Sequence, residues 1–189
     1  MEINKNNTQK TDIDYGYIGE ENLKNLDKTV HNVVKLLLSK GMTISVAESC
    51  TGGLITQLIT SVSGASQVFE MGLCAYANRI KHQFLDVPNE ELNTFGAVSS
   101  QVAISMARGI RMKSGSDISI SVTGIAGPEG GTIEKPVGTV YIGFCCGESA
   151  ESNLLHLWEL KDRSRENIRL HTALAVLMRV EQYLQNKTN

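Results

Sequence analysis

The chain has 189 residues, of which 41% are hydrophobic and 20% are charged, and its formal net charge is −2 at pH 7. This length suits one domain with a substantial core, and the charge balance gives no electrostatic basis for a nucleic-acid partner. No apolar stretch approaches the about 18 residues of a membrane span, and the opening sequence MEINKNN lacks the hydrophobic centre of a signal peptide. We therefore expect a cytoplasmic protein that does not contact a membrane.

The N-terminal residues differ in composition from the rest of the chain. Residues 1–25 are rich in Asn, Lys and Glu, with one aromatic island, YGYI, at 15–18. We interpret this segment as a mobile arm. Residues 26–189 contain no repeat and no low-complexity linker, so we predict that they form a single domain.

Apolar periodicity predicts helices and strands in alternation. Residues 26–40 carry an apolar stripe at helical spacing and are followed by Gly41, which favours a helix end. Residues 42–47 then alternate apolar and small side chains, which is typical of a strand with one buried face, and a helix begins near Gly53. The later predicted elements are a strand at 68–77, a short helix at 79–85, a helix from Ser99 or Ser100 to Met112, strands at 118–123, 137–145 and 154–160, and a final helix at 164–184.

This alternation of strands and helices indicates a layered α/β domain. Active sites in such sheets lie beyond the C-terminal ends of the strands, so we expect Ser49 and Thr123 to meet there. The four cysteines and four histidines show no metal-ligand spacing, and we predict no metal site. The cysteines are interpreted as reduced and mostly buried thiols.

Ser49 is the first candidate for chemistry, because it lies in the segment AESCTGG (47–53), where the predicted strand gives way to a helix. Backbone N–H groups at a helix N-terminus favour negative charge and can hold an oxyanion. The alternative is that Ser49 or Thr51 simply caps the helix, and this segment alone leaves both interpretations open. Alternation along the chain points the Cys50 side chain in another direction, so we expect Cys50 to pack in the core.

Five segments of the chain carry a recognisable pattern: ESCTGG (48–53), YANRIK (76–81), GAVS (96–99), VTGIAGPEGG (122–131) and KPVGTVY (135–141). Together they resemble the CinA C-terminal domain family, over about residues 30–184. The characterised members of that family are nicotinamide mononucleotide amidohydrolases of the PncC type. The resemblance implies a three-layer α/β/α sandwich on a mixed, mostly parallel sheet. It also implies hydrolysis of nicotinamide mononucleotide to nicotinic acid mononucleotide and ammonia in pyridine nucleotide recycling.

The resemblance implies a Ser/Lys mechanism with Ser49 as the nucleophile and Lys81 as its partner. An ordinary lysine, with a pKa of about 10.4, is protonated at neutral pH, but a desolvated lysine could accept the serine proton. Taken alone, Lys81 would be interpreted as a solvated helix residue. Tyr76 would relay a proton or orient the lysine, and a half-buried strand tyrosine is the alternative.

Substrate binding is assigned to residues around these three. Amides near Gly52 and Gly53 would stabilise the oxyanion, and the resemblance identifies Arg163 as the functional arginine of an Asp-Arg pair, for phosphate binding or for positioning the dyad. We interpret Arg165 and Arg169 as surface or salt-bridging residues, and Asp162 as the cap of the last helix. The full set of predicted substrate-binding residues is Thr51, Gly52, Gly53, Asn78, Thr123, Gly124 and Arg163.

Two positions depart from the family pattern: Ala77 stands where serine is common, and Glu129 puts a charge into a glycine-rich loop. They keep a second hypothesis open, a nucleotide-binding, competence-associated CinA-like module with little or no hydrolysis. An amidase for another pyridine or nucleotide amide is a third. The glycines near residue 127 match no P-loop or dinucleotide fingerprint, so we expect no bound cofactor. The predicted partners are a small nucleotide substrate and a second copy of the chain, in a homodimer or larger assembly.

Overall fold

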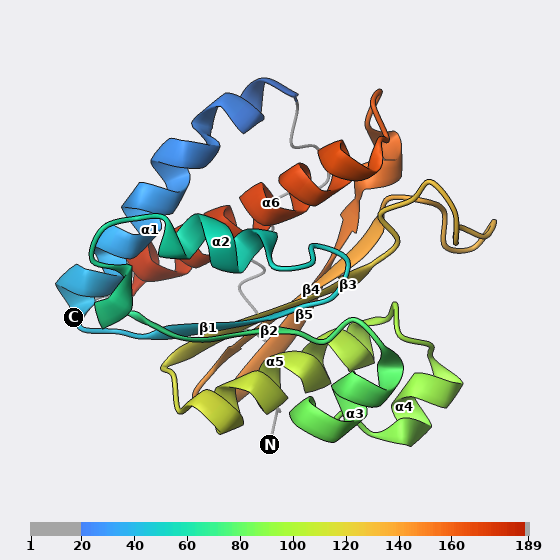
Figure 1. Ribbon diagram of the computed structural model, residues 1–189, viewed down its shortest axis with the longest axis horizontal. Coiled ribbons are helices and arrows are strands. Elements are labelled where there is room, and N and C mark those ends of the chain that lie inside the picture. Colours follow the sequence, from blue (N-terminus) through green and yellow to red (C-terminus); the bar gives the residue numbers. More distant parts are fainter. Residues whose placement is uncertain (1–19, 188–189) are drawn as a thin grey trace, which may run out of the picture.

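A five-stranded sheet lies between two layers of helices in the computed structural model, which describes residues 20–187 (Figure 1). The strand order is β2-β1-β3-β4-β5. Strand β1 is parallel to both β2 and β3, whereas β4 is antiparallel to both β3 and β5, so four of the five strands point the same way. The expected three-layer α/β/α fold on a mixed sheet is confirmed. The strands are β1 (Ile44–Glu48), β2 (Phe69–Cys74), β3 (Ile118–Gly124), β4 (Thr139–Cys146) and β5 (Ser149–His156).

The helices divide between the two faces of the sheet (Figure 1). One face is covered by α1 (Leu26–Lys40), α2 (Leu54–Thr60) and α6 (Arg165–Asn186). The other is covered by α3 (Asn78–Leu85), α4 (Asn89–Thr94) and α5 (Ser100–Ser114). Three 3-10 helices complete the described chain: η1 (Glu20–Asn25), η2 (Ala65–Gln67) and η3 (Leu157–Glu159).

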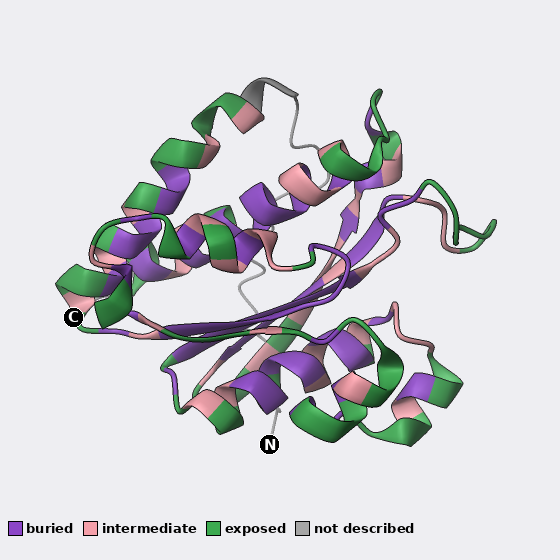
Figure 2. Cartoon of the chain, in the orientation of Figure 1, coloured by how far each residue is buried: buried purple, intermediate pink, exposed green. Residues whose placement is uncertain are grey.

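Strands β1 and β3 are buried on both faces (Figure 2), and for β1 this corrects the expectation of one buried face. Their large aliphatic residues, such as Ile120, pack in the cluster beneath α1, α2 and α6. Their serines lie against α5: the hydroxyl of Ser119 donates to the Ala107 carbonyl at 2.7 Å, and that of Ser121 donates to the Ala103 carbonyl. Serine is therefore tolerated in the interior because a helix carbonyl accepts its hydrogen bond.

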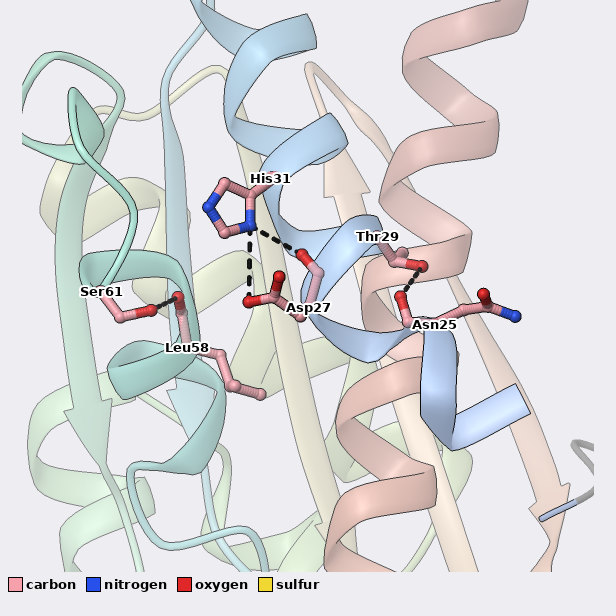
Figure 3. Close-up of polar contacts among 6 residues, drawn as sticks. All are labelled: Asn25, Asp27, Thr29, His31, Leu58 and Ser61. Carbon is pink, nitrogen blue, oxygen red and sulfur yellow. Dashed lines mark hydrogen bonds and ion pairs between the residues drawn. The ribbon is translucent and has the colours of Figure 1, made fainter. Parts of the chain in front are cut away.

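Local hydrogen bonds satisfy polar groups along the layer formed by α1 and α2 (Figure 3). The hydroxyl of Thr29 donates to the carbonyl of Asn25 at 3.0 Å, and that of Ser61 donates to the carbonyl of Leu58 at 2.7 Å. The Nδ1 atom of His31 lies 2.8 Å from the carbonyl oxygen one turn earlier. These contacts close within single helical turns, so they stabilise the helices without linking them to the end of the sheet where Ser49 lies.

The structure differs from the predicted elements at β5, at the end of β2 and at α4. Strand β5 begins earlier than predicted and ends at His156, because Leu157–Glu159 turns into η3 while the amide of Leu157 donates to the Gly138 carbonyl. The strand predicted at 68–77 ends at Cys74. Helix α4, with one buried residue, was not predicted. Residues 1–19 of the expected arm lie outside the described residues, and the rest forms η1, from which Leu23 packs against the core.

Candidate active site

Ser49 lies at the carboxyl end of the central strand β1, where the chain turns toward α2. Its amide donates to the carbonyl of Val122 on the neighbouring strand β3 at 3.0 Å, which fixes the backbone at this point. The residue is 8% exposed. Ser49 is therefore a nearly buried hydroxyl at the edge of the sheet where the parallel strands β1 and β3 end.

Lys81 comes from α3, in the opposite helical layer, and its side chain is 1% exposed. Its Nζ lies 3.0 Å from Ser49 Oγ, 2.8 Å from the Ala75 carbonyl oxygen and 3.0 Å from the Tyr76 carbonyl oxygen. Burial disfavours the charged amine and lowers the pKa of Lys81 from 10.5 to about 8. The structure thus brings together the two residues on which the predicted chemistry depends.

Cys50 follows Ser49 in sequence but faces the core. It is buried in the cluster beneath α1, α2 and α6, as predicted. Burial raises the pKa of the Cys50 thiol to about 12. The neutral thiol is a weak nucleophile, so Ser49 is the better candidate for the attacking group.

Glu48 caps α2, a role that the sequence analysis missed. Its carboxylate is fully buried and accepts hydrogen bonds from the amides of Gly53, Ile55 and Thr56, at 3.0, 3.2 and 2.8 Å. A carboxylate is stabilised there by the orphan amides and by the helix dipole. The interpretation of Ser49 or Thr51 as the helix cap is therefore wrong. Glu48 stands six residues before the first residue of α2, outside the usual capping position, so no local pattern in the sequence indicates this role.

The expected oxyanion donors at Gly52 and Gly53 are both engaged within the protein. Gly53 donates to Glu48, and Gly52 donates to the Ser49 carbonyl at 3.1 Å. Both glycines have positive φ, 59° and 92°, so their role here is to allow the turn. Among the residues that the structure describes, the amides of Cys50 and Thr51 make no hydrogen bond to another residue.

Two arginines from α6 reach this turn and its surroundings; Arg165 is exposed, as expected of a surface residue, whereas Arg169 is half-buried. Arg169 donates from Nε and Nη2 to the Thr51 carbonyl, at 3.1 and 2.6 Å. Arg165 donates to the Gly127 carbonyl at 2.8 Å and to the Tyr76 hydroxyl at 3.0 Å. Their spacing of four residues, which places both on one face of a helix, was the available signal.

Tyr76 contacts Lys81 through its backbone carbonyl, whereas its hydroxyl accepts from Arg165. The residue is 60% exposed, so the predicted half-buried strand position is wrong. Tyr76 lies beyond the end of β2, and its ring extends toward the N-terminal end of α6 rather than along the sheet. In this arrangement the phenol has no direct route to the proton shared by Ser49 and Lys81.

The remaining predicted binding residues have varied positions. The Thr123 hydroxyl is buried and donates to the Ala97 carbonyl at 2.7 Å. A Cβ atom at Gly124 would lie 2.7 Å from a Val140 methyl, so close packing requires glycine there. Asn78 is the exposed first residue of α3.

The Asp-Arg pair lies just before α6, and Arg163 is exposed. Asp162 is not the cap of this helix as predicted, because Ser164 occupies that position and accepts from the Asn167 amide. The carboxylate of Asp162 instead accepts from the Ser164 amide at 2.8 Å. Asp162 therefore supports the capping residue from one turn outside the helix.

Residues 20–187 include no group of three or more His, Cys, Asp and Glu side chains placed to hold a metal ion. The same part of the chain has no helix that is both long and apolar enough to cross a membrane.

The fold and site define an α/β/α domain with a serine-lysine pair at the carboxyl ends of its parallel strands. A family model, the CinA C-terminal domain, matches residues 26–184. The chain therefore belongs to the CinA C-terminal domain family.

Several relatives share this domain. The chain is 53% identical over 142 residues to a CinA-like protein of Dictyoglomus turgidum, covering 75% of this chain and 34% of that protein. It is 50% identical over 151 residues to a CinA-like protein of Geotalea daltonii, covering 79% and 36%. The crystal structure of competence/damage inducible protein CihA from Agrobacterium tumefaciens matches with a TM-score of 0.80 and 36% identity, over 86% of this chain and 96% of that one. The chain thus spans about a third of the length of these two curated relatives.

Proposed function

We propose that the protein is an amidohydrolase that converts nicotinamide mononucleotide and water to nicotinic acid mononucleotide and ammonia. The single observation that carries this proposal is the buried Lys81 amine, 3.0 Å from the Ser49 hydroxyl and with a pKa of about 8. A serine needs a base to become a nucleophile, and a lysine of lowered pKa supplies one at neutral pH. The resemblance to characterised amidohydrolases supplies the substrate.

The contacts of Lys81 explain how the amine acts as a base. A neutral amine has two N–H groups and one lone pair. The carbonyls of Ala75 and Tyr76 can accept both N–H groups, which leaves the lone pair directed at the Ser49 hydroxyl. Two backbone acceptors therefore orient the base, and the proton of Ser49 passes to Nζ as Oγ attacks.

The reaction then follows two steps. Ser49 Oγ attacks the carboxamide carbon of the pyridine ring, and the protonated Lys81 returns its proton to the amide nitrogen, which leaves as ammonia. Water attacks the resulting acyl-enzyme with the neutral Lys81 as base, and the acid product leaves as Ser49 regains its proton. Lys81 supplies both proton transfers, so the proposed chemistry needs no metal.

The negative charge of each tetrahedral intermediate needs hydrogen-bond donors. We assign this role to the amides of Cys50 and Thr51, since those of Gly52 and Gly53 are engaged elsewhere. Each well-placed donor of this kind contributes about 3 kcal/mol to transition-state stabilisation. The Cys50 amide directly follows the nucleophile in sequence, so this donor is part of the same turn and does not depend on another loop.

The test uses the purified protein with nicotinamide mononucleotide in the presence of EDTA, and follows ammonia and nicotinic acid mononucleotide. Wild type should release the two products in equal amounts, and Ser49→Ala and Lys81→Ala should release neither. Lys113→Ala is the matched control, because Lys113 pairs with Asp86 at the surface, 2.7 Å away, and its loss should leave the rate unchanged.

Three results would contradict all or part of this proposal. Folded wild type that binds the nucleotide without releasing ammonia would support a binding module instead. Turnover that survives in Ser49→Ala would show that the serine is not the nucleophile. Release of ammonia from another pyridine amide, with nicotinamide mononucleotide left intact, would keep the chemistry and replace the substrate.

A further inference from the structure

We infer that Arg169 is a positioning residue, which holds the turn after Ser49 so that the amides of Cys50 and Thr51 face the reacting carbonyl. This inference rests on the proposed function. Arg169 belongs to α6, more than a hundred residues beyond the turn in sequence, and it donates two hydrogen bonds to the carbonyl of Thr51, at 3.1 and 2.6 Å. A guanidinium group that donates twice fixes the direction of its acceptor as well as the distance.

The turn is anchored on both sides of the two amides that make no hydrogen bond to another residue in the described structure. On the N-terminal side, the Ser49 amide donates to the carbonyl of β3. On the C-terminal side, the Thr51 carbonyl is held by Arg169 and the Gly53 amide is held by Glu48. The peptide units that carry the amides of Cys50 and Thr51 lie between these anchors, and their orientation depends on them.

The peptide unit between Thr51 and Gly52 is the weak point of this turn. Glycine tolerates positive and negative φ equally well, so this peptide plane can rotate at little steric cost. Rotation would break the hydrogen bond from Gly52 to the Ser49 carbonyl and redirect the Thr51 carbonyl dipole within the turn. Arg169 opposes this rotation, because the observed orientation alone presents the carbonyl to both guanidinium nitrogens.

The charge of Arg169 acts in the same direction. A cation at the Thr51 carbonyl polarises the backbone of the turn and favours negative charge nearby. The buried carboxylate of Glu48 accepts from the amide of Gly53 and from the first amides of α2, just beyond the Thr51 carbonyl. The two charged groups thus hold the C-terminal side of the turn, and neither is hydrogen-bonded to Ser49 Oγ.

The experiment compares Arg169→Gln and Arg169→Lys with wild type. For nicotinamide mononucleotide, we expect kcat of Arg169→Gln to fall about 10- to 100-fold with KM within about threefold, because the hydrogen-bond donors are misplaced while the binding surface remains. Arg169→Lys retains the charge and one donor group, so its kcat should lie between those of wild type and Arg169→Gln. The pH midpoint of the rate should not move, since every contact of Lys81 is retained.

Arg179→Gln is the control for the loss of an arginine contact on the same helix. Arg179 pairs with Glu151 and lies over the ring of Phe144, 4.3 Å from its centre, and it makes no contact with the turn. This variant should keep the wild-type kcat. A comparable fall in kcat would mean that any disturbance of α6 lowers the rate, which would overturn the specific role of Arg169.

A second readout does not depend on the substrate. Phenylmethanesulfonyl fluoride sulfonylates an activated serine: Oγ bonds to sulfur, fluoride leaves and the base takes the hydroxyl proton. The rate of Ser49 labelling, followed by intact mass, should fall about tenfold or more in Arg169→Gln, because negative charge also develops on the sulfonyl oxygens. If wild type is labelled but does not deamidate the nucleotide, the substrate proposal fails and this inference is still tested.

Several results would overturn the inference. One is a folded Arg169→Gln whose kcat and labelling rate both stay within about threefold of wild type. Another is a rise in KM with both rates unchanged, which would make Arg169 a substrate contact. If circular dichroism shows that Arg169→Gln does not fold, kcat and the labelling rate of Arg169→Lys are compared with those of wild type instead, and values within about threefold of wild type would overturn the inference. Wild type that is neither labelled nor active would overturn this inference together with the proposed function.

Discussion

The titration of Lys81 gives the sharpest prediction for catalysis. Because the pKa of Lys81 is about 8, roughly 9% of its amine is neutral at pH 7. A lysine with a pKa of 10.5 would be about 0.03% neutral at the same pH. Burial therefore increases the population of the active base by about 300-fold at this pH. We expect kcat/KM to rise tenfold per pH unit below pH 7 and to level off above pH 8, for a gain of about 50-fold between pH 6 and pH 8.

The assay follows ammonia release from pH 6 to 10 in buffers of constant ionic strength. The phosphate group of the nucleotide itself titrates near pH 6, so a second profile uses the uncharged sulfonyl fluoride and measures Ser49 labelling. The two profiles should share one midpoint near pH 8. A rate that is flat from pH 6 to 9, or that still rises steeply above pH 9.5, would refute the assignment of Lys81 as the neutral base.

The same protonation equilibrium must affect folding. Folding lowers the pKa of Lys81 from 10.5 to about 8, so the unfolded chain binds more protons between these pH values and stability rises with pH across this window. At about 1.4 kcal/mol per pH unit, wild type should gain about 3 kcal/mol of unfolding free energy relative to Lys81→Met between pH 8 and 10.5. Urea unfolding of both proteins measures this difference, and parallel curves for the two proteins would contradict it.

Three further predictions concern neighbouring residues. Tyr76→Phe should keep kcat within about threefold of wild type, because the phenol is hydrogen-bonded to an arginine of α6 and not to Ser49 or Lys81. A loss of 100-fold or more would instead support Tyr76 as a proton relay. Cys50→Ser should retain turnover, and wild type should resist iodoacetamide at pH 7.5, since the thiol pKa is about 12; rapid alkylation at Cys50 would contradict this. Gly109→Ala should lose about 1–3 kcal/mol of unfolding free energy in urea, because the added Cβ would overlap the Leu85 carbonyl. The control Arg108→Ala changes an exposed residue and should keep the wild-type stability, so equal stabilities of the two variants would refute the packing argument.

The order of strands and helices could be predicted because it depends on local periodicity. Apolar spacing located α1, α2, α5 and α6, and Gly41 closes α1 with φ 59° as expected. Edge strand β5 was misplaced because its residues are mostly half-exposed and show no clear alternation. Short α4 has one buried residue, Leu92, which is too few to produce a helical pattern.

The residues of the site that belong to a family motif could be predicted from the sequence. The residues whose role depends on tertiary contacts could not. Ser49 and Lys81 are 32 residues apart, and nothing local indicates that Lys81 is buried; the family resemblance supplied the pair. The sequence predicts a surface position or a salt bridge for Arg169, because only the packing of α6 brings this residue to Thr51. Glu48 was overlooked because a polar residue at a strand end is ordinary until its three amide partners are known.

The two members of the dyad come from opposite sides of the sheet. Ser49 leads into the layer of α1, α2 and α6, Lys81 belongs to the layer of α3, α4 and α5, and the two layers have separate apolar clusters. If the layer of α3, α4 and α5 is detached, Ser49 has no base, and a serine without a base is chemically inert toward amides. Under the proposed function, reactivity therefore requires α3 to be packed against the sheet, and a growing or partly unfolded chain in which it is not packed carries no active nucleophile that could attack the wrong molecule.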